Sequence, residues 1–261
     1  MKTNNALQQA NNYASKRAQA ERNVKSHITS ILQAAVKSIV QQVSMIRLSS
    51  NQSLFKQIIA TMSANSLADA NSKIEEYIIA YSKASIRVLG DKDTGAVTRL
   101  LNGELFGKTF RDRNDAYMRY FANDVANLIL ACKKLKMSRN ETEEALLKYF
   151  TDPYSSDIIN RANRMGAGIQ TPSYGRGLYH SAFQNIVRNA QGTISIAWER
   201  EQRNYARRNG AIGFRIHRGS SYPCDICDEQ VAYGVHPITD DMPPFHSRCC
   251  CIVEFVYKQE D

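Results

Sequence analysis

The sequence predicts a mainly α-helical protein, in which a multi-helix body is followed by a small C-terminal β cap, an α+β arrangement. Two observations carry this prediction. Apolar residues recur at helical spacing through most of residues 28–209, as they do along the buried face of a helix. Residues 214–218 alternate apolar and basic side chains, and residues 252–257 form a second strand-like run. With 261 residues and 43% hydrophobic content, the chain can build one large or two modest folded units.

Residues 1–90 are expected to form a basic helical region. Residues 5–24 can be helical but contain few apolar residues that would pack. A stronger amphipathic pattern begins at residue 28. Its apolar stripe comprises Ile28, Ile31, Leu32, Ala35, Val36, Ile39, Val40, Val43 and Ile46.

A break in this pattern is predicted at Ser49-Ser50-Asn51. A short helix near Leu54 should follow. A separate helix is then predicted over residues 66–88, with Asn65 or Ser66 as its N-cap, since both residue types accept hydrogen bonds from a helix start.

Residues 91–210 are expected to form the helical core. Thr94 should cap a short helix that reaches Leu101, and two glycines predict an irregular link over residues 103–113. A helix over residues 115–135 should follow this link.

Three later signals complete the core. Ser138 and Glu141 match a capping box, which predicts a helix from there to Tyr149. Glycines and a proline mark residues 166–177 as a loop. The longest late helix is predicted over residues 178–209, with Trp198, the one tryptophan, on its buried face.

Five of the six cysteines fall within the last forty residues, in a pattern that suits a metal ion. Cys224 and Cys227 form a Cys-x-x-Cys pair, and His246 and Cys249 form a His-x-x-Cys pair eighteen residues later. Zn²⁺ takes four such nitrogen and sulfur ligands tetrahedrally, and a closed Cys₃His set leaves no open position for a substrate. Residues 211–261 are therefore expected to form a small β-hairpin module held by structural Zn²⁺.

The fourth ligand has two candidates. Cys249 completes the His-x-x-Cys pair. Cys251 is the alternative, because alternate residues of an extended segment share a face, and Cys250 should point the other way. His236, in the intervening segment, is expected to be a solvent-facing loop residue.

Two other interpretations of the cysteines fit the sequence less well. Disulfides would suit a secreted protein, but residues 1–20 are polar and lack the apolar stretch of a signal peptide. Buried free thiols leave the ligand-like spacing without an explanation. Reduced cysteines suit an intracellular protein, and no apolar run approaches the ~18 residues of a membrane span.

Positive charge is concentrated at the N-terminus. The formal net charge is +9, and residues 1–60 hold eight Lys and Arg against a single acid, Glu21. Such an arm favours polyanions or acidic protein surfaces. The residues expected to make these contacts are Lys16, Arg17, Arg22 and Lys25. The bases are spread out, so sequence-specific DNA recognition is not implied.

Three segments within residues 90–257 resemble those of a known family. They are the loop LFGKTFRDR over residues 105–113, the helix start KMSRNE over 136–141, and the ending PPFHSRCCC over 243–251. With the preceding Cys-x-x-Cys, they resemble the phage head morphogenesis family, the Mu F-like minor head proteins of tailed phages. The family ending is usually His-Pro-x-Cys-Arg-Cys, and this chain departs from it at Ser247 and Cys250.

The resemblance implies a structural role in the virion. Such proteins are similar to low-copy head components that act beside the portal during capsid assembly in the host cytoplasm. It implies the portal and other head proteins as partners and no small-molecule substrate. Packaged DNA is then a further expected contact for the basic arm, through phosphate neutralisation.

Two other function classes were considered. In a zinc-stabilised nuclease, His217 would be the base, but it stands without a surrounding catalytic constellation, so no catalytic residue is assigned and the protein is not expected to be an enzyme. A regulatory zinc module would bind nucleic acid through a basic face. That face would comprise Arg203, Arg207, Arg208, Arg215 and Arg218.

Overall fold

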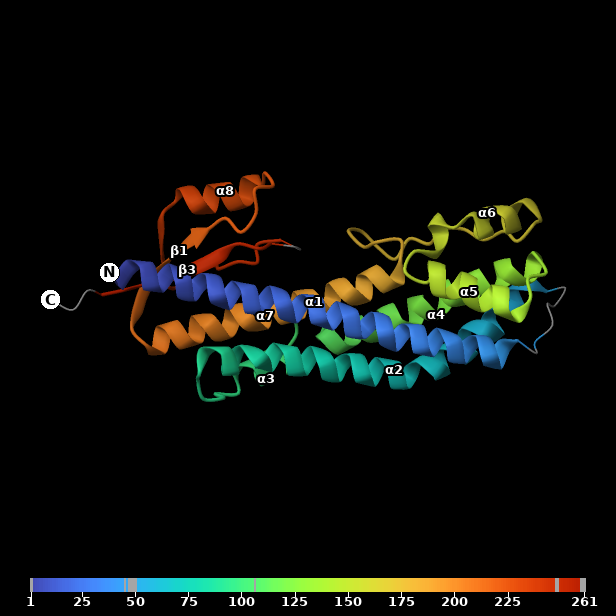
Figure 1. Ribbon diagram of the computed structural model, residues 1–261, viewed down its shortest axis with the longest axis horizontal. Helices are drawn as coiled ribbons and strands as arrows, with labels where there is room; N and C mark the ends of the chain where they lie inside the picture. The colour runs from blue at the N-terminus through green and yellow to red at the C-terminus, as the bar shows by residue number, and fades with distance from the viewer. Residues whose placement is uncertain (1, 45, 47–50, 106, 247–248, 259–261) are drawn as a thin grey trace. The chain divides into compact units, whose positions relative to one another are not determined.

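The computed structural model describes residues 2–44, 46, 51–105, 107–246 and 249–258 (Figure 1). Helix accounts for 67% of the chain, and a small three-stranded antiparallel sheet lies near the C-terminus. The predicted class, a mainly α-helical body with a small C-terminal β cap, is confirmed.

The chain divides into two compact units, each built from separate stretches. Unit 1 comprises Met1–Val24, Ile78–Thr109 and Ala190–Asp261, and unit 2 comprises Lys25–Tyr77 and Phe110–Asn189. These units do not follow the predicted boundaries at residues 90 and 210. The reason is that three long helices, α1 (Lys2–Val43), α2 (Gln52–Leu89) and α7 (Ala182–Arg208), each contribute to both units.

The first two helices are longer than the sequence predicted. Helix α1 runs without interruption through residues 5–24. Ala10, Tyr13, Ala20 and Val24 are buried there and are spaced so that they lie on one face of the helix. Helix α2 likewise continues through Asn65 and Ser66, so neither residue is an N-cap. The predicted break at residues 49–51 lies outside the described residues except for Asn51, whose Oδ1 accepts the backbone N–H of Leu54 at 3.0 Å.

Unit 2 contains three further helices. They are α4 (Phe110–Lys134), α5 (Arg139–Tyr149) and α6 (Asp157–Arg164), with a 3-10 turn, η1 (Pro153–Ser155), before α6. The capping box of α5 forms as predicted, with Ser138 accepting the N–H of Glu141 and the Glu141 carboxylate accepting that of Ser138. Helix α6 was not predicted.

Helix α7 begins later than the sequence predicted. The Asn185 side chain accepts the backbone N–H of Tyr179 at 3.0 Å and donates to the Tyr179 carbonyl at 2.8 Å. These two bonds hold Tyr179 outside the helix, which starts at Ala182. The glycine-rich residues 166–177 form the predicted loop.

Unit 1 holds the short helix α3 (Ala96–Asn102) and the cap. The cap comprises β1 (Ala211–His217), α8 (Asp225–Ala232), β2 (Val235–Pro237) and β3 (Ile252–Tyr257), with the strands in the order β2-β1-β3. Strand β3 matches its prediction, whereas β1 starts earlier and includes Gly213. The N-cap of α3 is Gly95, with φ of 72°, rather than Thr94.

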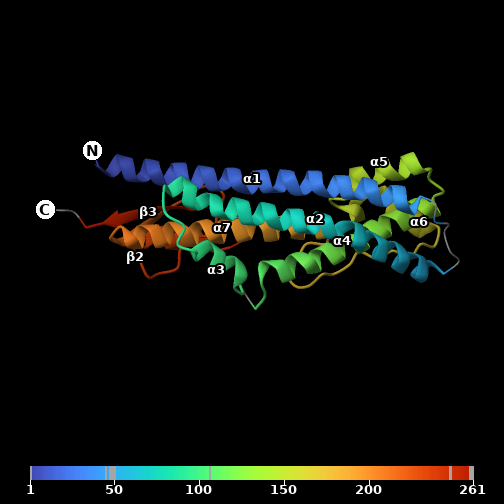
Figure 2. The same ribbon diagram turned by 90° about the horizontal axis from the view of Figure 1, so that it is seen from below.

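Trp198 is buried, as predicted, and it links its own helix α7 to α1 and α2 within unit 1. Its indole N–H donates to the carbonyl of Tyr81 in α2 at 2.8 Å. Its own carbonyl accepts the hydroxyl of Tyr13 in α1 at 2.7 Å, and the two rings pack with centroids 4.9 Å apart. The first half of α1, the end of α2 and the second half of α7 therefore form one packed group within unit 1 (Figures 1 and 2).

Candidate metal centre

The cap brings two cysteine-bearing segments together. Cys224 is the N-cap of α8, and Cys227 lies in the first turn of that helix with 2% of its surface exposed. His246 and Cys249 come from the segment that leads into β3. The N–H of Cys249 donates to the His246 carbonyl at 3.1 Å, which keeps these two residues close together.

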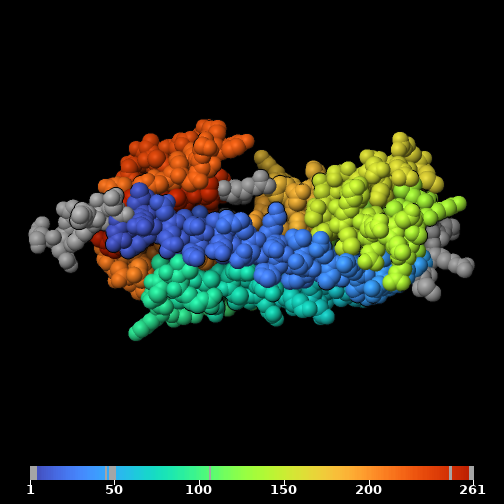
Figure 3. All heavy atoms as spheres, viewed as in Figure 1, coloured from blue at the N-terminus to red at the C-terminus, as the bar shows by residue number. Residues whose placement is uncertain are grey.

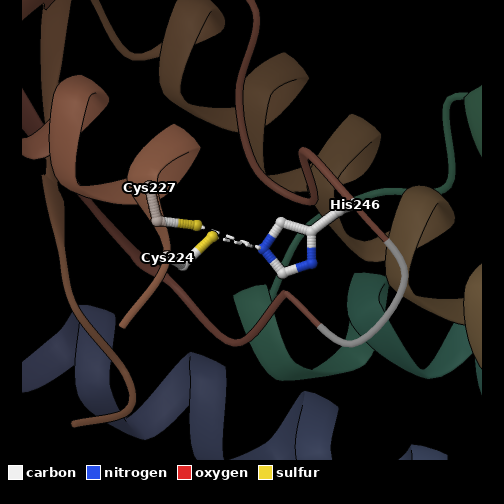
Figure 4. Close-up of side chains that lie close together, drawn as sticks. All are labelled: Cys224, Cys227 and His246. Atoms are coloured by element: carbon white, nitrogen blue, oxygen red, sulfur yellow. Dashed lines mark hydrogen bonds between the residues drawn. The ribbon is translucent and has the colours of Figure 1, made fainter. Parts of the chain in front are cut away.

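Figure 4 shows the two α8 sulfurs pointing toward the imidazole of His246. The His246 Nε2 lies 3.3 Å from the Sγ of Cys224 and 3.2 Å from the Sγ of Cys227. The Sγ atoms of Cys227 and Cys249 are 3.9 Å apart. A tetrahedral Zn²⁺ site sets neighbouring donors about 3.3–3.8 Å apart, given its bond lengths of about 2.0–2.3 Å. The three printed contacts lie close to this spacing.

A second group of donors shares Cys227. The Sγ atoms of Cys227, Cys249 and Cys251 all lie within 4.8 Å of one another, and all three residues are buried. Cys250, between them, is exposed. The alternation expected for this segment is confirmed. The five predicted ligand residues fall into two groups of three that share Cys227, and the cluster can hold a metal ion.

Two charged residues outside the donor set position Cys224. Asp228 Oδ2 accepts the backbone N–H of Cys224 at 3.3 Å, and the Asp228 N–H donates to the Cys224 carbonyl at 2.9 Å. The Arg218 guanidinium pairs with the Asp228 carboxylate and lowers its pKa. Arg218 also donates to the Tyr222 carbonyl, which fixes the loop before α8.

Hydrogen bonding and burial shift the pKa values of the four thiols in different directions. Hydrogen bonding from Cys251 lowers the pKa of Cys249 and raises that of Cys251. Burial raises the pKa of Cys227, and the backbone N–H of Cys227 lowers that of Cys224. Crowded thiols cannot all ionise unless a cation compensates their charge, so metal binding here displaces protons.

The cap packs against the first helix within unit 1. Arg17 Nη2 donates to the carbonyl of Cys251 at 3.4 Å, and Arg17 also pairs with Glu21 at 3.6 Å. Figure 1 shows β3 beside the first half of α1, and Figure 3 shows the two surfaces meeting. At Gly219, a Cβ would overlap the carbonyl oxygen of Cys250, so the loop before α8 approaches the cysteine run backbone to backbone.

The prediction that Arg17 binds a polyanion is wrong. It is 8% exposed and serves the interior of unit 1, so it cannot meet a DNA phosphate. Lys16, Arg22 and Lys25 are exposed on α1. The reason is helical phase: residue 17 falls on the same face as Tyr13 and Val24, whereas the other three fall outside it.

Two histidines of the cap differ from their expected surroundings. His236 is 3% exposed rather than solvent-facing. It lies in β2, its Nε2–H donates to the Gln230 carbonyl at 2.7 Å, and its ring stacks on Phe214. His217 does not stand alone, since its Nε2 lies 2.7 Å from Glu254 Oε2 on the neighbouring strand.

No family model, curated protein or solved structure matches the chain. Across the described residues, every helix is too polar or too short to span a bilayer. Of the ending PPFHSRCCC, Ser247 and Arg248 lie outside the described residues, as does Phe106 in the central loop.

The sequence did not single out Arg17, Arg218, Asp228 or Gly219 as residues of this centre. Asp228 had a local signal, because an acid four residues after an N-cap residue can accept a hydrogen bond from the backbone N–H of that residue. Arg17 and Gly219 contact residues distant in sequence, so spacing alone gave no sign of them. Arg218 contacts Tyr222 and Asp228 nearby, but its sequence position carries no recognised motif.

Proposed function

We propose that the cap is a structural zinc clip and that the protein is a minor head protein of a tailed phage or prophage. The observation that carries the clip is the close approach of Cys224 and Cys227 to His246, with the Cys249 thiol 3.9 Å from that of Cys227, at distances close to those of tetrahedral Zn²⁺. Four protein ligands fill the zinc shell and leave no position for a substrate. The clip therefore acts through folding rather than catalysis.

The virion role rests on the resemblance of residues 90–257 to Mu F-like minor head proteins, and the fold is compatible with it. The protein acts during capsid assembly beside the portal, with the exposed bases Lys16, Arg22 and Lys25 available to packaged DNA or to an acidic portal surface. The buried contacts of α1 with the cap support a rigid scaffolding element rather than a free arm.

Density-gradient fractionation of assembled heads tests this role. The chain should sediment with DNA-filled heads and give crosslinks to the portal, at a few copies for each head. A control fraction of empty, portal-free capsid shells should lack it. Recovery of the chain only at the top of the gradient would rule out a virion role.

A nuclease is the second candidate, because His217 has a carboxylate partner in Glu254 that can orient its imidazole. Incubating the metal-loaded protein with plasmid DNA and Mg²⁺ tests it. Cleavage that is lost in His217→Ala, while Cys250→Ser retains it, would favour the enzyme over the structural role. We expect no cleavage by the unaltered chain or by either variant.

A further inference from the structure

We propose that the clip has interchangeable fourth ligands: a Zn²⁺ ion held by Cys224, Cys227 and His246 takes its fourth ligand from either Cys249 or Cys251, and either one suffices. This inference rests on the proposed zinc clip. It concerns the surplus in the donor set, since five residues offer ligand atoms, in two groups of three that share Cys227, whereas tetrahedral Zn²⁺ takes four.

Cys227 is the common point of the cluster. It belongs to the group with Cys224 and His246 and to the group with Cys249 and Cys251, and the ligand atoms of each group lie within 4.8 Å of one another. A metal ion bound by the first group has Cys227 as a ligand. Both remaining thiols therefore adjoin a sulfur that already holds the metal.

Both thiols are also buried on the same side of the segment. Cys249 is 7% exposed and Cys251 is 2% exposed, whereas Cys250 points to solvent. A buried thiol beside the metal has no competing water to ligate it. Neither candidate has to be drawn in from the surface before it can bind.

The backbone that carries the two thiols is fixed at three consecutive residues. The N–H of Cys249 donates to the His246 carbonyl, the Cys250 carbonyl faces Gly219, and the Cys251 carbonyl accepts from Arg17. Exchange of the fourth ligand therefore requires rotation of side chains rather than a shift of the chain. The two states share one fold of the cap.

Replacing the cysteines singly and together tests the proposal. Cys249→Ser and Cys251→Ser should each retain one zinc per chain, and their Co²⁺ derivatives should each show the charge-transfer absorption of three thiolates. The double variant Cys249→Ser/Cys251→Ser should lose more than about 100-fold in zinc affinity, since even partners outside the ligand shell contribute about 10–100-fold. Cys250→Ser is the matched control and should behave as the unaltered chain.

The outcomes separate this proposal from the zinc clip itself. If the unaltered chain binds no zinc, the clip fails and the exchange fails with it. If the unaltered chain binds zinc but one single variant loses it as the double variant does, the clip stands and that cysteine is a fixed ligand. Far-UV circular dichroism of each variant in excess zinc separates lost affinity from lost folding, and Cys→Ala replacements exclude ligation by the serine hydroxyl.

Discussion

At residue 219 the chain has no room for a side chain. A Cβ there would overlap the backbone oxygen of Cys250, so the backbone of the loop or of the cysteine run would have to shift. We expect Gly219→Ala to lower the free energy of unfolding of the cap by about 1–3 kcal/mol or more, the usual cost of overpacking.

Gly192 supplies a control, because its replacement should change the free energy of unfolding in the opposite direction. It lies inside α7, and a Cβ there would meet no atom within 4 Å. Gly192→Ala should therefore raise the free energy of unfolding by about 0.5–1 kcal/mol, because alanine loses less backbone entropy in a helix. Urea denaturation of both variants gives the comparison, and a shift of the same sign in both would contradict the assignment of close contact to residue 219.

Asp228 also acts at the scale of a single residue, through the N–H of Cys224. Asp228→Ala should lower the zinc affinity by about 10–100-fold, the range seen when a partner of a ligand is removed. Competition with a chromophoric chelator measures it. Asp225→Ala removes an equal charge from the same helical turn, and an equal loss there would assign the effect to the helix dipole instead.

Among elements, α4 and the segment before α7 meet at one buried carboxylate in unit 2. Asp124, 1% exposed, accepts the hydroxyls of Tyr154 at 2.9 Å and of Tyr174, and the backbone N–H of Ala182 at 2.9 Å. Burial raises its pKa to about 6, although these three bonds oppose the rise. The carboxylate thus fixes the start of α7 and titrates in a mildly acidic range.

This residue predicts a pH dependence of stability. Because its folded pKa exceeds the unfolded value of about 3.8, the native state binds the proton more tightly between pH 4 and 6, and stability falls as pH rises through that window. Relative to Asp124→Asn, the unaltered chain should gain up to about 3 kcal/mol in free energy of unfolding from pH 7 to pH 4. Denaturant titrations at several pH values measure the difference, which would be constant if Asp124 did not titrate.

Elements with a local signal were predictable from the sequence, and those without one were not. Helix α5 was found because Ser138 and Glu141 cap it within four residues. Helix α8 and strand β2 are too short for a periodic pattern to register. His236 was misassigned for that reason, since its burial depends on a strand the sequence did not reveal.

Arg17 was misassigned because its acceptor is 234 residues away in the chain. The metal donors, by contrast, were predictable together, since ligand spacing is a local property of each segment. The fourth ligand was not predictable, because it depends on side-chain positions around Cys227 that the spacing of the residues does not encode.

For the whole molecule, the two units should respond differently to loss of metal. The donors all lie in unit 1, whereas unit 2 has its own core, in which Phe150 packs edge-to-face against Phe121 and Phe183. Chelation should therefore abolish hydrogen-exchange protection over residues 211–257 and leave residues 110–150 protected. Equal loss in both segments would show that the metal supports the whole fold rather than the cap.

The net charge of +9 is also a property of the whole chain, but only exposed bases can meet a polyanion. Replacing Lys16, Arg22 and Lys25 by Gln should reduce the slope of log affinity for duplex DNA against log salt concentration by about 2.7, if each base neutralises one phosphate. A control triple variant at the exposed bases Lys92, Lys136 and Arg164 removes the same charge elsewhere. An equal reduction in both variants would mean that DNA responds to total charge, and an unchanged slope in the first would leave the acidic protein surface as the partner of these three residues.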